Sequence, residues 1–218
     1  MKDVTTIPRA VINRLARYHF LLSDLKEKGI EKISSQELSR IMGITASQLR
    51  QDLSYFGEFG QRGYGYRIQD LFQHIQDILG MTQRHTMVVI GAGNLGQALV
   101  QYSGFRDNGF QIKALFDINP KMIGMQVAGV PVLDVDELAV FIRRENISLA
   151  AITVPKMAAQ SVAEMLVDSG VDGIWNFAPM ELKLDTGIPV ENVNLLGSLL
   201  VLTFNVHAKL GFPPSKNI

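Results

Sequence analysis

The amino-acid sequence predicts two modules, a small helical one followed by an α/β module with a parallel sheet. At 218 residues the chain exceeds the roughly 100 to 150 residues of a common single domain. Helix-capping signals and a glycine-rich stretch occupy residues 1–67, whereas a glycine-rich strand-to-helix turn begins only at Gly91. Charge divides similarly, because residues 1–85 hold 12 Lys/Arg against 9 Asp/Glu and residues 86–218 hold 9 against 12. The positive first segment favours a partner with negative charge.

Composition excludes several kinds of site and location. The sequence has no cysteine, which excludes disulfides, thiolate nucleophiles and cysteine-ligated metals, and we predict no metal site. Residues 1–8 lack the apolar stretch of a secretory signal, and no run approaches the ~20 apolar residues of a membrane span. We therefore expect a cytoplasmic protein with no membrane partner.

A long helix and two short ones are expected in the first module. The long helix starts at Pro8 and ends at Gly29, with apolar residues at helical spacing, namely Ile12, Leu15, Leu22 and Leu25. Ser34-Ser35-Gln36-Glu37 is a capping box for a short helix that Gly43 ends, and Thr45-Ala46-Ser47-Gln48 is a second box. Two capped helices joined by a glycine-containing turn predict a helix-turn-helix. The second would be the recognition helix, whose exposed polar positions include Ser47, Gln48, Arg50, Gln51 and Ser54.

The segment 57–67 is predicted to form a small β-hairpin. It combines four glycines with alternating aromatic residues, Phe59, Tyr64 and Tyr66, and places Arg62 at the tip. A basic hairpin beside a recognition helix is a wing, which can enter a minor groove. The alternative is a helical docking or dimerisation domain with a flexible loop. A helix over 68–79 follows, so we expect a winged helix domain over 1–80 and a linker over 81–85.

A dinucleotide-binding fingerprint opens the second module. Gly91-Ala92-Gly93-Asn94-Leu95-Gly96 follows the apolar run 87–90 and precedes a helix expected from Asn94 to about Ser103. A second strand, 112–116, ends in Asp117, which lies 21 residues beyond Gly96 and suits an acid that binds the adenosine ribose. Such an acid repels a 2′-phosphate and favours NAD over NADP. The alternative is a glycine-rich turn that binds nothing.

Further βα units complete a Rossmann domain over 86–192. Strands are expected at 130–132, 147–154 and 174–177, and helices at 134–145 and 156–169, with helices on both faces of the sheet. Thr153-Val154-Pro155 lies at the carboxyl end of a strand, where open α/β sheets bind ligands.

The last helix, within 193–218, is apolar nearly all round. Such a helix must be buried on more than one side. Either a second subunit covers it or it is an ordinary core helix of the monomer.

A redox enzyme would also need a group that moves a proton while the nicotinamide moves hydride. There is no Tyr-x-x-x-Lys pattern, and no recognisable carboxylate motif adjoins the downstream candidates, which include Lys156, Lys183, His207 and Lys209. We therefore predict no catalytic residue. The competing class is a small NAD-dependent oxidoreductase or a CoA-binding-like domain with a helical dimerisation module.

Five segments carry a family resemblance: residues 48–57 (QLRQDLSYFG), 60–66 (GQRGYGY), 91–96, 116–117 and 175–179 (WNFAP). In these segments the chain resembles the Rex redox-sensing transcriptional repressors. The resemblance implies a homodimer that binds double-stranded operator DNA through winged helices and senses NADH and NAD as regulatory ligands. It also implies that NADH releases the DNA and that the C-terminal helix is exchanged between subunits.

The resemblance extends the two sets of site residues. The DNA-binding set gains Tyr55, Phe56, Gly60, Arg62 and Gly63. The NAD(H)-binding set is Gly91, Ala92, Gly93, Asn94, Leu95, Gly96, Asp117, Ile118, Thr153, Val154 and Pro155, with Tyr102 near the nicotinamide. Some family members differ from this chain at five of its positions. They have Lys in place of Gln51, Arg in place of Asn94 and of Phe20, and an Asp-Phe pair in place of Asn194-Leu195.

Overall fold

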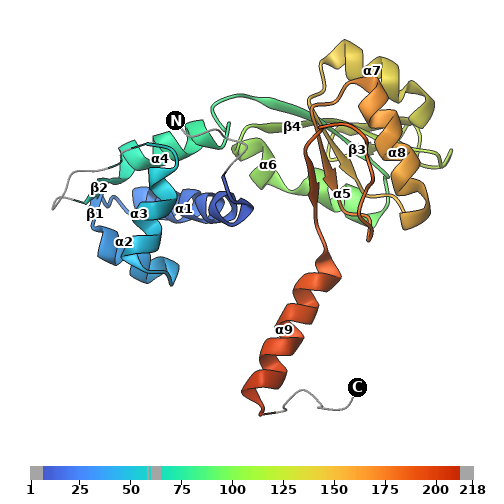
Figure 1. Cartoon of the computed structure of the whole chain (residues 1–218). Helices are drawn as coiled ribbons and strands as arrows, with labels where there is room; N and C mark the ends of the chain where they lie inside the picture. The colour runs from blue at the N-terminus through green and yellow to red at the C-terminus, as the bar shows by residue number, and fades with distance from the viewer. Residues whose placement is uncertain (1–6, 58, 60–64, 212–218) are drawn as a thin grey trace. The chain divides into compact units, whose positions relative to one another are not determined.

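The structure is a computed structural model that describes residues 7–57, 59 and 65–211. The chain forms two compact units, an N-terminal unit of residues 1–83 and a C-terminal unit of residues 84–218 (Figure 1). The division falls within the segment 81–85. In the described part of the chain, no helix has both the length and the apolar character needed to cross a membrane.

The N-terminal unit packs four helices around one apolar core. The helices are α1 (Arg9–Glu27), α2 (Ser35–Met42), α3 (Ala46–Ser54) and α4 (Ile68–Ile78). The fully buried Leu15 and Leu22 of α1 meet Leu38 of α2, Leu49 of α3 and Ile75 of α4 in this core. The helical spacing of apolar residues in the sequence therefore has its expected result, a shared core.

Local hydrogen bonds explain where the two short helices begin. Ser34 Oγ accepts a hydrogen bond from the Glu37 amide at 3.1 Å, and Thr45 Oγ1 accepts one from the Gln48 amide at 3.1 Å. Each caps an otherwise unpaired helix amide. Between them Gly43 ends α2 in the left-handed region, with φ of 68°. The predicted helix-turn-helix is thus present as α2, a short turn and α3.

A two-stranded sheet links the segment between α1 and α2 to the segment that precedes α4. Strand β1 (Lys32–Ile33) pairs antiparallel with β2 (Tyr66–Arg67), and Tyr66 is buried in the core. Gly65 precedes β2 with φ of 75°, and a Cβ there would collide with the carbonyl oxygen of Ile33. Strand β1 was not predicted from the sequence. Residues 58 and 60–64, which hold most of the predicted hairpin and Arg62, lie outside the described residues.

The C-terminal unit is built on a seven-stranded sheet in the order β5-β6-β4-β3-β7-β8-β9. Its strands are β3 (His85–Ile90), β4 (Phe110–Asp117), β5 (Gln126–Val127), β6 (Val130–Asp134), β7 (Leu149–Ile152), β8 (Gly173–Asn176) and β9 (Val190–Asn192). All adjacent pairs are parallel except β5 with β6. In register, Ile90 pairs with Phe116 and Ile152, so the ends of β3, β4 and β7 coincide.

Helices cover both faces of this sheet, as predicted. The short 3-10 helix η2 (Val135–Glu137) leads into α7 (Leu138–Glu145), which packs with α8 (Lys156–Ser169) on the face that includes Val88 and Phe116. The helices α5 (Asn94–Gln101) and α6 (Ser103–Asp107) follow β3, and Leu99 of α5 packs on the opposite face. The mostly parallel sheet with helices on both faces is the Rossmann-like architecture that the βα rhythm predicts.

Several details of this unit differ from the prediction, including the strand expected at 147–154, which spans only Leu149–Ile152. The helix expected from Asn94 to about Ser103 ends at Gln101, because Tyr102 adopts an extended conformation (φ −76°, ψ 106°) and α6 starts anew. Strands β5 and β9 were not predicted. They have two and three residues, too few to show a periodic pattern.

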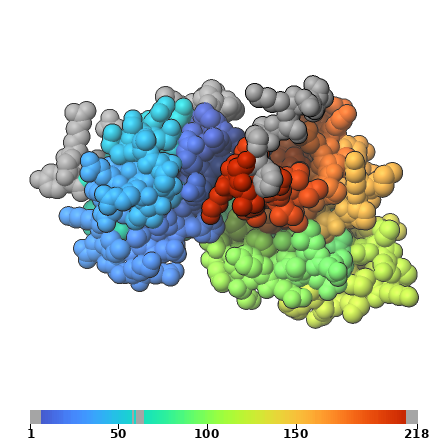
Figure 2. Space-filling view, turned by 90° about the horizontal axis from the view of Figure 1, so that it is seen from below, coloured from blue at the N-terminus to red at the C-terminus, as the bar shows by residue number. Residues whose placement is uncertain are grey.

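The last helix, α9 (Leu195–Lys209), has no buried residue in the single chain. Leu195, Leu199, Phe204 and other apolar side chains of α9 are exposed, and Figure 2 shows this segment in red at the molecular surface. Asn194 caps its start by accepting a hydrogen bond from the Gly197 amide at 2.7 Å. The alternative of an ordinary monomer core helix is therefore wrong.

Candidate functional sites

The glycine-rich loop between β3 and α5 uses its three glycines differently. Gly91 has φ of 103°, and a Cβ there would lie 2.9 Å from Thr153 Oγ1. A Cβ on Gly96 would collide with the carbonyl oxygen of Gly91. At Gly93 an added Cβ would meet nothing within 4 Å, and no side chain caps the N-terminus of α5 there. Gly91 and Gly96 are therefore needed for packing, whereas Gly93 faces open space beside uncapped helix amides.

Thr153 fastens this loop to the neighbouring strand β7. Its Oγ1 lies 3.0 Å from the carbonyl oxygen of Ile90 and 2.9 Å from that of Gly91, and the hydroxyl donates toward them. The side chain of Gln97 donates from Nε2 to the carbonyl oxygen of Ala92 at 2.8 Å. The loop is thus held in shape without a ligand.

Asp117 ends β4 directly beside the loop. Its Oδ2 accepts a hydrogen bond from the Ala92 amide at 2.6 Å, and its Oδ1 accepts one from the Asn119 amide at 2.8 Å. Sequence reasoning predicted a ribose contact for Asp117 and missed the hydrogen bond by which it holds the loop. Because each carboxylate oxygen can accept two hydrogen bonds, both retain capacity for hydroxyl groups of a ligand.

A pocket of about 520 Å³ adjoins the loop and Asp117. This volume falls in the range of small-molecule sites, which is roughly 300 to 1,000 Å³. Seven of the predicted residues line it, namely Gly91, Gly93, Asp117, Ile118, Thr153, Val154 and Pro155. The structure adds lining residues that were not predicted as contacts, including Val135, Phe177 and Pro179. Ala92 and Gly96 are buried, Leu95 is half-buried and Asn94 is exposed, and none of the four lines the pocket.

Tyr102 lies elsewhere in the C-terminal unit. It is 62% exposed at the break between α5 and α6, and its ring contacts that of Phe105 with centroids 4.9 Å apart. It lines a different cavity of about 390 Å³, beside Arg106 and the first half of β4. Within the single chain, the structure does not bring Tyr102 to the pocket of Asp117.

The exposed surface of α3 carries most of the predicted recognition residues. Ser47, Arg50, Gln51 and Ser54 are exposed, and the Ser54 hydroxyl donates to the carbonyl oxygen of Gln51 at 2.8 Å. Tyr55 is partly exposed, whereas Phe56 packs against the core of the unit. Gly60, Arg62 and Gly63 lie outside the described residues.

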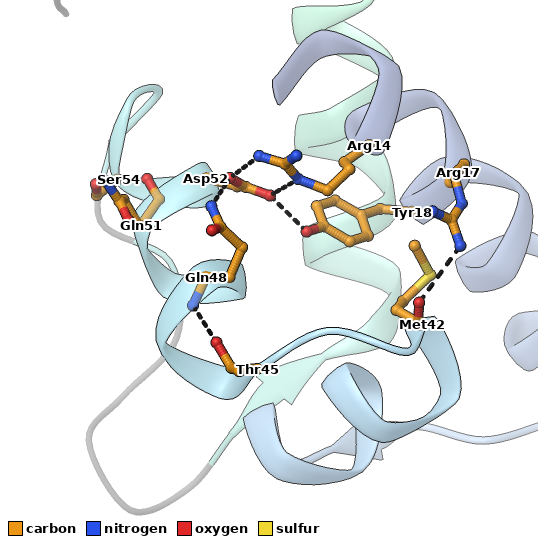
Figure 3. A network of polar contacts seen from close by, with 9 residues as sticks. All are labelled: Arg14, Arg17, Tyr18, Met42, Thr45, Gln48, Gln51, Asp52 and Ser54. Atoms are coloured by element: carbon orange, nitrogen blue, oxygen red, sulfur yellow. Dashed lines mark hydrogen bonds and ion pairs between the residues drawn. The ribbon is translucent and has the colours of Figure 1, made fainter. Parts of the chain in front are cut away.

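A buried polar network anchors α3 to α1 (Figure 3). Asp52 is 0% exposed, and it forms an ion pair with Arg14 and accepts a hydrogen bond from the Tyr18 hydroxyl at 2.7 Å. Gln48 also donates to Asp52, from Nε2 at 2.8 Å, rather than completing a capping box with its side chain. Sequence reasoning missed Asp52, although its position three residues after Leu49 is on the buried side of the helix.

The charge on Asp52 follows from these contacts. Burial alone would raise the pKa of Asp52, but hydrogen bonds from Arg14, Tyr18 and Gln48 outweigh it and hold the pKa below its ordinary value. Burial and the hydrogen bond to Asp52 raise the pKa of Tyr18. The carboxylate is therefore ionised and the phenol neutral at physiological pH.

Comparisons with known proteins connect both units to described families. The family model for a CoA binding domain matches residues 82–180, and that for the N-terminus of a putative DNA-binding protein matches residues 6–54. The redox-sensing transcriptional repressor Rex of Clostridioides difficile (strain 630) is 52% identical over 198 residues, which cover 91% of this chain and 94% of that protein. Rex of Clostridium novyi (strain NT) is 45% identical, covering 94% and 97%.

The chain belongs to the Rex family of redox-sensing transcriptional repressors. Solved Rex-family structures have the same fold over nearly the whole chain. RSP in complex with β-NAD⁺ and operator DNA has a TM-score of 0.90 at 43% identity, covering 94% of this chain and 95% of that one. RSP in complex with β-NADH has a TM-score of 0.88 at 40% identity, covering 95% and 97%. These Rex proteins are named as repressors, so the resemblance is confirmed and the oxidoreductase alternative is set aside.

Proposed function

We propose that this chain is a transcriptional repressor that binds operator DNA as a homodimer and releases it when NADH binds. The observation that carries the proposal is the combination, in one Rex-family chain, of an exposed polar recognition helix with a preformed pocket beside Asp117. The relative RSP has been solved with both kinds of ligand, β-NAD⁺ together with operator DNA and β-NADH.

The residues at the pocket fit a dinucleotide. The open space at Gly93 and the uncapped amides of α5 suit the pyrophosphate, which helix N-termini bind through N–H groups and the helix dipole. The remaining acceptor capacity of Asp117 suits the ribose hydroxyls, and its charge disfavours a 2′-phosphate. Ile118, Val154 and Pro155 supply apolar walls. In this proposal Ala92, Leu95, Gly96 and Thr153 support the loop, Asn94 flanks the pyrophosphate, and Tyr102 reaches the nicotinamide only in the assembled dimer.

On the DNA, α3 would lie in the major groove. Ser47, Gln48, Arg50, Gln51 and Ser54 would contact bases and phosphates, with Tyr55 and Phe56 at the end of the helix. The segment with Gly60, Arg62 and Gly63 would form the wing in the adjacent minor groove. The pairing of β1 with β2 supports a winged helix, because it ties the strand after this segment to the helical core.

The C-terminal helix α9 would form the dimer, exchanged between subunits. Its exposed apolar surface needs a cover that the single chain does not provide, and a second copy supplies an identical apolar helix. We propose the domain limits 1–80 for the winged helix domain, 81–85 for the linker, 86–192 for the Rossmann domain and 193–218 for the dimerisation segment. The protein would act in the cytoplasm, where the NADH/NAD ratio is the signal.

The switch would depend on a difference in NADH affinity between two arrangements of the dimer. Free or NAD-bound protein would keep the half-site spacing that operator binding needs, and NADH would favour a closed arrangement that loses it. Shifting such an equilibrium from 1:99 to 99:1 takes roughly 5.5 kcal/mol of differential affinity. The two NADH sites of a dimer would share this difference in binding free energy.

The test is operator binding measured with each nucleotide separately. Palindromic DNA selected by the protein is labelled, and its anisotropy is followed as NADH or NAD⁺ is added. We expect NADH to release the DNA and NAD⁺ at the same concentration to leave it bound. Unchanged operator affinity at saturating NADH would contradict the proposal.

A further inference from the structure

The proposed recognition helix contains a carboxylate whose hydrogen-bonding capacity is filled. Arg14 donates to Asp52 from Nε at 2.6 Å and from Nη2 at 2.7 Å, one bond to each carboxylate oxygen. Tyr18 adds a second bond to Oδ2 at 2.7 Å, and Gln48 adds a second bond to Oδ1 at 2.8 Å. Two donors on each oxygen satisfy the four acceptor sites of a carboxylate. With a bidentate guanidinium partner, this group can accept hydrogen bonds but has none to donate.

This chemistry determines which end of the Gln48 amide faces the network. The oxygen and nitrogen of a glutamine amide are ordinarily interchangeable, and the surrounding hydrogen bonds must decide between them. Next to an ionised carboxylate, the NH₂ group must face Asp52, because the carbonyl oxygen would meet negative charge. Figure 3 shows the amide oxygen turned away from Asp52, and no residue in the described part of the chain donates to it.

We infer that Asp52 is a positioning residue that turns the Gln48 carbonyl toward the DNA, so that Gln48 selects a base carrying an exocyclic amino group. The inference rests on the proposed function, in which α3 lies in the major groove. Gln48 is the third residue of α3, and the N-terminal residues of a recognition helix contact base edges.

The bases that fit are adenine and cytosine. In the major groove adenine presents its N6 amino group and cytosine its N4 amino group, whereas guanine and thymine present carbonyl oxygens at the corresponding places. A carbonyl held outward meets repulsion from these oxygens. A glutamine free to rotate its amide would bind bases that present an amino group and bases that present a carbonyl oxygen. Asp52 therefore supplies the discrimination between these two kinds of base without touching the DNA.

A double-mutant cycle between the protein and the DNA tests this assignment. Each adenine of the selected half-site is replaced in turn by purine, which lacks the N6 amino group, and each cytosine by 2-pyrimidinone, which lacks the N4 amino group. We expect one symmetric position at which this loss weakens wild-type binding about tenfold. Gln48→Met should show no such loss at that position, while the control Gln36→Met, on the exposed surface of α2, should behave as wild type.

The second variant is Asp52→Asn, which tests the role of Asp52 itself. An amide at position 52 can donate to the Gln48 oxygen and allow the reversed orientation, so we expect guanine or thymine to become tolerated at the same position only. Circular dichroism checks the fold of this variant. If Asp52→Asn does not fold, the inference is judged from the double-mutant cycle with Gln48→Met. The inference is overturned if wild type tolerates loss of every amino group, or if Gln48→Met weakens all sequences equally. Wild-type protein that binds no palindromic DNA would instead refute the proposed function.

Discussion

At the residue scale, the three loop glycines differ in whether the fold leaves room for a side chain. Gly91 and Gly96 leave no room for a Cβ, because Thr153 and the loop backbone occupy the space, whereas Gly93 borders the open pocket. The fingerprint predicted all three glycines and Asp117 from spacing alone. It could not predict that Asp117 also holds the Ala92 amide, because that contact depends on the register of β3 and β4.

We predict that Gly93→Ala folds normally but binds NADH about tenfold more weakly or worse. The new methyl group meets no protein atom within 4 Å, so it occupies only the space through which the pyrophosphate approaches the backbone. Thermal unfolding and NADH fluorescence measure the two effects. The matched variant Gly96→Ala should instead lose stability, by about 1 to 3 kcal/mol, because its methyl group collides with the loop backbone. If Gly93→Ala bound NADH as tightly as wild type, the pyrophosphate would not lie at Gly93.

His19 makes the N-terminal unit sensitive to acid. It is buried, it stacks on Phe72 with ring centroids 4.9 Å apart, and its Nε2 has no hydrogen-bond partner among the described residues. Burial lowers the pKa of His19 below its ordinary value of 6.5. As the pH falls below about 6.5, the unfolded chain therefore binds a proton that the folded chain does not, and stability is lost.

We accordingly expect the free energy of unfolding to fall between pH 7.5 and pH 5.5, and to fall less in His19→Phe. Urea unfolding at a series of pH values measures both slopes. Equal slopes for the two proteins would show that His19 contributes nothing to acid sensitivity.

At the element scale, capping signals predicted the helix-turn-helix closely. The hydroxyl groups of Ser34 and Thr45 cap α2 and α3, and Gly43 ends α2, because these effects act within a few residues. Elements that depend on distant partners were missed. Strands β1, β5 and β9 have two or three residues each and exist only through pairing with other strands. The break at Tyr102 was also missed; its ring lies so close over Gly104 that a Cβ there would be 2.5 Å away.

For α3 we predict that Arg50→Ala weakens operator binding at all sequences and lowers the salt dependence. Arg50 is exposed on α3, the proposed recognition helix, and each lost phosphate contact reduces the slope of log affinity against log salt by about 1. Anisotropy titrations at several salt concentrations give the slope. Arg143→Ala on α7 replaces an arginine that is also exposed but lies in the other unit, so it serves as the control and should leave the slope unchanged. An unchanged slope in Arg50→Ala would remove this residue from the phosphate contacts.

At the scale of the whole molecule, the single chain leaves α9 uncovered. The sequence indicated a helix that must be buried on more than one side, but it left two possible covers. Because no residue of α9 is buried in the single chain, only a cover from outside the chain remains.

We predict that Val201→Glu on α9 converts the dimer to monomer and weakens operator binding. A charge in an apolar interface is desolvated without a partner, and both half-sites need the dimer. The control is Val140→Glu on α7, because Val140 is 61% exposed and Val201 62% exposed in the single chain. Sedimentation velocity distinguishes the species. A stable Val201→Glu dimer would exclude α9 from the interface.

The central claim is that occupancy of the pocket beside Asp117 releases DNA from the N-terminal units. The most direct measurement follows both events in one sample, with NADH emission reporting occupancy and the anisotropy of labelled operator DNA reporting release. We predict that the two signals change over the same range of NADH concentration in wild type, and that Gly93→Ala shifts both together. Saturation of the pocket with NADH while the operator stays bound would contradict the account.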